Sequence, residues 1–203
     1  MPLDNSGKSV EKVFILYREQ FLPIYADLIA LQGVKPMQIL IEESNFLSHL
    51  CQFYNDTLDE DTRNDNLIKS ENHLIRAVID LNKLVWASLR SKLDQLIIAQ
   101  PTKRLSFNLP EEDVLNGFKQ FFDRGREARK FEMQNIGNNP ISCVEYYQRA
   151  TRIGVELFEK VDVLKVAKIN SWTAIVKTKE FLFGVAASIV ATILCGGAVW
   201  IFH

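Results

Sequence analysis

Residues that form turns and break helices are scarce in this sequence. Only 9 glycines and 6 prolines occur among 203 residues, and the intervening stretches carry apolar residues three and four positions apart. Strands joined by tight turns need frequent Gly, Pro and Asn, whereas apolar residues at helical spacing mark the buried face of a helix. The sequence therefore predicts an all-α fold, a helical bundle of four to five helices.

Cysteine and histidine are also few. The cysteines, Cys51, Cys143 and Cys195, are odd in number, scattered and without the spacing of metal ligands. This excludes a disulfide framework and favours reduced thiols in a cytosolic protein. No Gly-rich phosphate loop and no helical His-Glu-x-x-His pattern occurs. We therefore predict no catalytic, cofactor-binding or metal-binding residue, and no cofactor.

Charged residues are absent from Phe181 to Phe202, which reads FLFGVAASIVATILCGGAVWIF. As a helix this run would be about 33 Å long, enough to cross a hydrocarbon core of about 30 Å. Lys177 and Lys179 precede it, and a cationic flank favours a cytoplasmic location for the N-terminal side. The sequence predicts a single-pass membrane protein inserted by its tail, in a bacterial inner membrane. A buried core helix is the alternative.

Small residues recur at steps of three and four along this run. Close approach of helix backbones needs such residues, and Ser or Thr can hydrogen-bond across the contact. We predict that the membrane helix self-associates through one face, which makes a homo-oligomer the expected state. That face comprises Gly184, Ala187, Ser188, Ala191, Thr192, Cys195 and Gly196.

The rest of the chain divides into a bundle and a stalk. Helices are predicted over about 9–32, 36–54, 67–99 and from Pro110 to a break at NIGNNP, 135–140, with a polar acidic loop over 55–66. Gly33 is expected to end the first helix, and Pro23 to kink it. No stop signal follows Pro140. The predicted parts are thus 1–139, a cytosolic helical bundle; 140–180, a stalk helix packed on that bundle; and 181–202, the transmembrane helix.

A short basic segment, DRGREARK over 123–130, is the one candidate for contact with nucleic acid. Its cations are Arg124, Arg126, Arg129 and Lys130, and phenylalanines lie nearby. Asp123 and Glu127 can neutralise them at helical spacing, and the net charge of the whole chain is −1. We therefore do not expect nucleic acid to be the main partner.

The segment ENHLIRAVIDLNKLVWASL, Glu71 to Leu89, resembles the central helices of small bacterial helical domains of the HEPN type. Such domains occur as RNases and as non-catalytic parts of antiviral systems. A membrane-tethered bundle of this size also resembles the accessory membrane proteins of type VI CRISPR systems, some of which form oligomeric pores. The RNase motif of the family, Arg followed after four to six residues by His, is absent, because Arg63 lies ten positions before His73.

Three hypotheses follow for the function. The first is a self-associating membrane protein, in its sharper form a membrane-disrupting or pore-forming effector of bacterial antiviral defence with a protein partner in that system. The second is a HEPN-like RNase that uses His73 with Asn72 or Arg76. The third is a passive tail-anchored scaffold that recruits a partner to the membrane.

Overall fold

The computed structural model describes residues 5–135, 138 and 140–201, and the side chains of 10–135, 138, 140–176 and 178–183. The described residues form seven α-helices, one π-helical turn and one 3₁₀ helix. They contain no β-strand, apart from a single antiparallel bridge between Phe107 and Val161. The all-α prediction is confirmed.

The N-terminal helix runs through a π-helical turn instead of being one regular helix. α1 spans Asn5–Leu16, the turn η1 spans Tyr17–Phe21, and α2 spans Leu22–Gln32. The amide of Leu22 donates to the carbonyl of Tyr17, five residues back. A proline at position 23 would crowd the carbonyl of residue 19 in a regular helix, and the wider turn relieves that clash. Gly33, with φ of 73°, ends α2 as expected.

Helices α3 and α4 form an antiparallel pair. α3 spans Met37–Phe53, close to the prediction, whereas α4 spans Glu60–Ile97 and begins seven residues before the predicted start. Asp59 caps α4, because its carboxylate accepts hydrogen bonds of 2.8 Å from both the amide and the hydroxyl of Thr62. Acidic residues that suggested a loop, Glu60 and Asp61, therefore lie in the first turn, where they complement the helix dipole.

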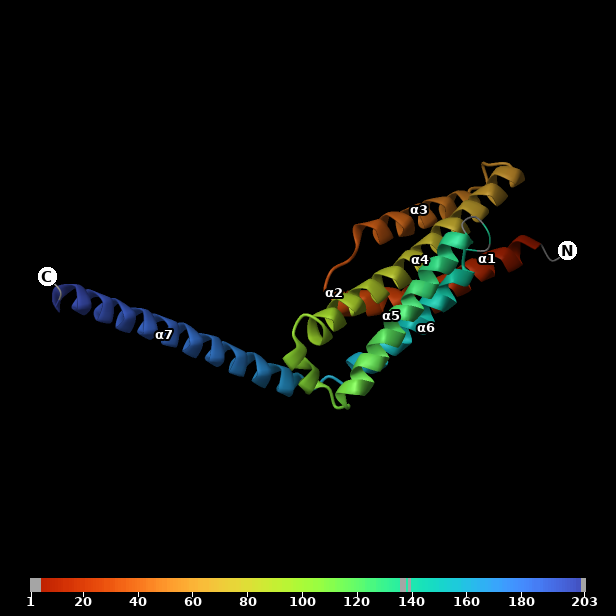
Figure 1. Cartoon of the computed structure of the whole chain (residues 1–203). Coiled ribbons are helices and arrows are strands. Elements are labelled where there is room, and N and C mark those ends of the chain that lie inside the picture. Colours follow the sequence, from red (N-terminus) through yellow and green to blue (C-terminus); the bar gives the residue numbers. More distant parts are fainter. Residues whose placement is uncertain (1–4, 136–137, 139, 202–203) are drawn as a thin grey trace.

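α4 is the central helix of the bundle (Figure 1). It packs against α3 on one side and α6 on the other, and α1, η1 and α2 also contact it. α5, Glu111–Gln134, and α6, Ser142–Phe158, form a second helical pair beside it. The predicted apolar stripe of α4 is buried along most of its length, at Leu74, Val78, Leu81, Val85, Leu89 and Leu93.

The prediction of one unbroken helix from Pro140 into the tail is wrong. α6 ends at Phe158 and α7 spans Val163–Ile201. Between them the chain pairs with the end of η2, the 3₁₀ helix Pro101–Ser106. The amide of Asn108 donates to Lys160, and the amide of Asp162 donates to Ser106, both at 2.8 Å. These partners satisfy backbone groups that an uninterrupted helix would have used.

α7 leaves the bundle and projects away from it (Figure 1). Among the described residues it contacts one element, η2. Within this part of the chain, no helix combines the length and the apolar character needed to cross a membrane. The predicted association face, Gly184 to Gly196, and most of the predicted transmembrane segment lie outside the residues whose side chains are described.

Candidate functional site

A pocket lined by cations and aromatic rings lies between α4 and α5 and is the strongest candidate site. We call it the Trp86 pocket, and its volume is about 370 Å³. Because α4 residues spaced three and four apart share a face, Lys83, Trp86 and Arg90 line one wall. The other walls come from α5 and α6. The remaining lining residues are Ala87, Phe122, Gly125, Arg126, Arg129 and Tyr147.

Gly125 allows the two helices to meet at this pocket. A Cβ atom at this position would lie 2.1 Å from Cε2 and 2.2 Å from Nε1 of Trp86. Real side chains never come so close, so the indole fits only because residue 125 has no side chain. The nitrogen Nε1 of Trp86 is buried and has no hydrogen-bond partner among the described residues.

Arg90 is held between two aromatic rings. Its guanidinium carbon lies 4.7 Å from the centroid of Phe122 and 5.5 Å from that of Trp86. Cation–π attraction of this kind fixes the guanidinium without consuming its N–H donors. Its carboxylate contact is with Asp94 at 3.5 Å, beyond the usual range of a hydrogen bond.

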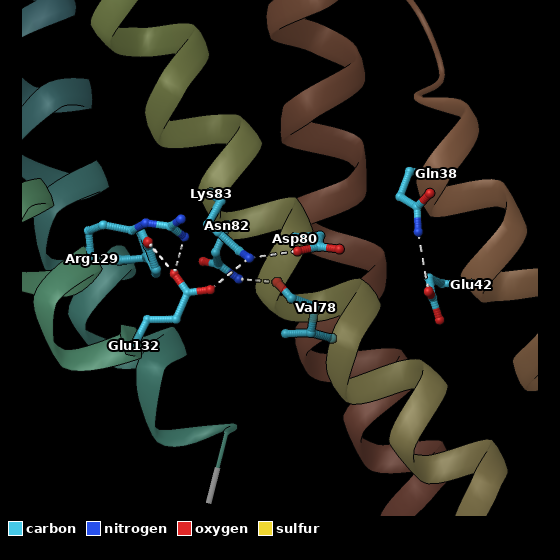
Figure 2. A network of polar contacts seen from close by, with 9 residues as sticks. Gln38, Glu42, Val78, Asp80, Asn82, Lys83, Arg129 and Glu132 are labelled. Atoms are coloured by element: carbon cyan, nitrogen blue, oxygen red, sulfur yellow. Dashed lines mark hydrogen bonds and ion pairs between the residues drawn. The ribbon is translucent and has the colours of Figure 1, made fainter. Parts of the chain in front are cut away.

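Two residues of the pocket lining, Lys83 and Arg129, belong to a polar network (Figure 2). Glu132 accepts from Lys83 and Arg129, each at 2.9 Å, and from the Tyr147 hydroxyl at 2.8 Å. Lys83 also pairs with Asp80 at 2.8 Å. Figure 2 shows Glu132 reaching from α5 towards Lys83 on α4, so the network joins the two helices.

This network shifts the pKa of its members. Desolvation by burial raises the pKa of Glu132, but hydrogen bonds from Lys83, Tyr147 and Arg129 outweigh it, and the net pKa lies below its usual value. For Lys83, desolvation lowers the pKa, and hydrogen bonds to Asp80 and Glu132 raise it above its usual value. Burial, and then the bond to Glu132, raise the pKa of Tyr147 well above its ordinary value. All three groups therefore keep their ordinary charge state at neutral pH.

The four cations predicted for nucleic-acid contact do not form one site. Arg126 and Arg129 line the Trp86 pocket. Arg124 pairs with Glu127 at 2.8 Å on the exposed surface. Lys130 lines a separate depression with Asp123, Arg126 and Glu127, where the carboxylates offset its charge.

Trp86, Arg90 and Lys83 were not singled out from the sequence. The signal that could have found them is the spacing of Trp86 and Arg90, four residues apart, which places a cation over an indole on a helix surface. The residues of α5 that lie against Trp86 could not be identified from the sequence, because packing sets the register between two helices.

His49 and His73 lie in a second polar cluster, between α3 and α4. His73 Nδ1 contacts Glu42 Oε2 at 2.7 Å, and His49 Nδ1 contacts Asn66 Oδ1 at 2.8 Å. The two rings stack with centroids 5.3 Å apart. These contacts join α3 to α4, an arrangement typical of a structural role.

The residues named for an RNase site lie together on α4. No hydrogen bond joins His73 to Asn72 or Arg76 in the described part of the chain, and both of these residues are exposed. Among the described side chains, no group of three or more His, Cys, Asp and Glu is placed to hold a metal ion.

A larger and more open cavity, about 700 Å³, lies where α7 meets η2. Leu105 and Trp172, which line it, are 70% and 69% exposed. Lys165 and Lys168 stand at its edge. An apolar surface beside two cations is therefore left open at the start of α7.

The geometry defines an all-helical bundle with a cationic, aromatic-lined pocket and a projecting helix. Comparison of the chain with protein-family models, with curated proteins and with solved structures finds no match.

Proposed function

We propose that this chain is a membrane-anchored, self-associating helical protein whose bundle binds a partner or ligand at the membrane surface. The observation that carries the proposal is the course of α7. It leaves the bundle after Asp162 and leads directly into the 22 uncharged residues from Phe181 to Phe202.

The described part of α7 supports this proposal. Its large apolar side chains are open to solvent: Val163, Leu164, Phe181 and Phe183 are each at least 70% exposed. Phe181, Leu182 and Phe183 are consecutive and exposed. Soluble monomers rarely leave contiguous apolar surface uncovered, so a bilayer or another copy of the chain is expected to cover this part of α7. Trp172 with Lys165 and Lys168 matches the residue types enriched on the cytoplasmic side of membrane helices.

Fractionation of cells tests the anchor. The full chain should be found with membranes, and a variant ending at residue 180 should be found in the soluble fraction. Ile189→Arg with Ile193→Arg should also release the protein, because each central arginine opposes insertion by about 3 kcal/mol. The matched control is Ile189→Leu with Ile193→Leu, which should remain in the membrane. A double-arginine variant that stays membrane-bound would overturn the proposal.

Self-association is tested by the mass of the protein in detergent. Replacing Gly184, Ser188 and Gly196 with leucine should reduce the oligomer, because small residues permit close helix contact. An unchanged mass would place the interface elsewhere, and a wild-type monomer would remove self-association from the proposal.

The sharper function, disruption of the membrane by an effector, is favoured by one specific observation. The joint between α6 and α7 is tied to η2 by two backbone hydrogen bonds and by a side-chain bond from Lys165 to Asn108 at 2.7 Å. Through these bonds, a rearrangement of the bundle can displace the start of α7. The passive scaffold requires no such route.

A further inference from the structure

We propose that the Trp86 pocket binds a phosphate monoester that carries an aromatic ring, the chemistry of a nucleoside monophosphate. The proposal does not depend on the membrane anchor. It rests on the size of the pocket, on the positive charge of its lining and on the guanidinium donors that this lining contains.

The size of the pocket suits a small organic molecule. Its volume of about 370 Å³ lies within the range of small-ligand pockets, roughly 300–1,000 Å³. Inorganic phosphate alone would leave most of that space empty. Trp86, Ala87 and Phe122 provide an apolar and aromatic wall on which a planar ring can pack.

Four cations line the pocket, Lys83, Arg90, Arg126 and Arg129, whereas no carboxylate belongs to its lining. Lys83 is matched by two carboxylates, Asp80 and Glu132. Arg129 shares Glu132 with Lys83 through one of its nitrogens. Arg126 makes no ion pair within 4 Å among the described residues, but it is close enough to Asp123 to help lower the pKa of that carboxyl. Arg90 pairs with Asp94 at 3.5 Å. The carboxylates near these cations thus lie outside the lining, and the lining itself is cationic.

The charged groups that line the pocket are donors. The guanidinium groups of Arg90, Arg126 and Arg129 have N–H donors beyond those used in their ion pairs. A phosphate monoester has about two negative charges at neutral pH and three acceptor oxygens, and it matches the fork of arginine in a bidentate manner. A carboxylate offers fewer acceptors and half the charge, so the donor set favours phosphate.

Calorimetric titration of the full chain in detergent tests the proposal, with AMP, adenosine and inorganic phosphate as probes. AMP should bind at one site per chain, and adenosine and phosphate should each bind at least tenfold more weakly. Arg126→Gln should weaken AMP binding at least tenfold. The matched control, Arg124→Gln, lies on the same helix outside the pocket and should change binding less than twofold. Thermal melting of both variants should show intact folding, since Arg126 is exposed and Arg124 loses only an exposed pair with Glu127.

Several outcomes would overturn the proposal. AMP that fails to bind, or that binds Arg126→Gln as tightly as wild type, removes the pocket as a phosphate site. Inorganic phosphate that binds as tightly as AMP removes the organic ring from the assignment. A single-stranded oligonucleotide that binds where AMP does not would make this surface a nucleic-acid interface instead.

Discussion

At the scale of single residues, the closest contact between α4 and α5 depends on the absence of one side chain. Gly125 lies against the indole of Trp86, and Gly154 on α6 lies similarly against Phe121 of α5, where a Cβ would approach Cε2 to 2.6 Å. Gly117 differs, because a Cβ there would meet Leu157 at 3.5 Å, an ordinary contact distance. Replacement by alanine of Gly117 and of Gly125, both on α5, should therefore change the stability of the fold in opposite directions.

Gly125→Ala should destabilise the fold by about 1–3 kcal/mol, the usual cost of overpacking a core. Gly117→Ala, on the same helix, should stabilise it by up to about 1 kcal/mol, because alanine favours the helix and the space is available. Chemical denaturation of the two variants measures both changes. A neutral Gly125→Ala would show that the indole has room to move, contrary to the packing described above.

Glu132 links the stability of the bundle to pH. Its folded-state pKa lies below its usual value, so its contribution is present above the unfolded-state pKa and is lost as pH falls through the folded-state value. Glu132→Gln should destabilise the protein by about 2 kcal/mol at pH 7, because Lys83 and Arg129 lose a charged acceptor. Below about pH 4 the difference from wild type should shrink.

Urea denaturation at several pH values measures this effect. Glu127→Gln serves as control, because it breaks only the exposed pair with Arg124 and should cost less than about 1 kcal/mol. A Glu132→Gln penalty that stays constant from pH 7 to pH 3 would contradict the assignment to the ionised carboxylate.

At the scale of elements, the joint between α6 and α7 shows where local sequence patterns fail. No glycine or proline marks the break, and the apolar spacing continues across it. The carboxylate of Asp162 instead accepts from the amides of Leu164, at 3.0 Å, and Lys165, at 3.1 Å, and so caps α7. The strand-like pairing of Val161 with Phe107 joins positions distant in the sequence, which a scan for helix-stop signals does not detect.

Asp162→Ala should weaken the start of α7 by about 1 kcal/mol, the usual cost of losing a helix cap. Asp162→Asn keeps an acceptor at the cap and is the matched control. Hydrogen exchange should show faster exchange at residues 164–166 in the alanine variant and little change in the asparagine variant. Equal exchange in both variants would mean that packing against η2, and not the cap, holds this end of the helix.

The elements differ in how far the sequence determines them. α3 and α5 were predicted closely, because a proline precedes each and apolar residues recur through both. The start of α4 was placed too late, since acidic residues that cap a helix resemble a polar loop.

The Trp86 pocket could be predicted only in part. Arg126 and Arg129 stood out by charge, but their proximity to Trp86 and Arg90 depends on the packing register of α4 and α5.

At the scale of the whole molecule, the bundle and the projecting helix form two parts joined at one small contact. α7 begins at a joint fixed to η2, and from Val163 to Ile201 its backbone is an uninterrupted helix. A stiff helix transmits a rotation or displacement of the bundle along its axis, provided that the bundle has two arrangements between which a partner or ligand selects. Under the effector hypothesis, the stiffness of α7 is therefore part of the mechanism, whereas a passive scaffold does not need it.

Weakening α7 without changing its length or register separates these two functions. Expression of the wild-type chain with its genomic neighbours and a triggering phage should collapse the membrane potential, as a potential-sensitive dye reports. Thr173→Gly with Ala174→Gly should abolish the collapse while leaving the protein in the membrane fraction, because each glycine weakens the helix by about 1 kcal/mol relative to alanine. Thr173→Ala, the matched control, keeps the helix and should depolarise as wild type does. The double-glycine variant could depolarise the membrane as well as wild type does, or the membrane potential could never change. Either result excludes coupling through α7 and makes the passive scaffold the better explanation of the function.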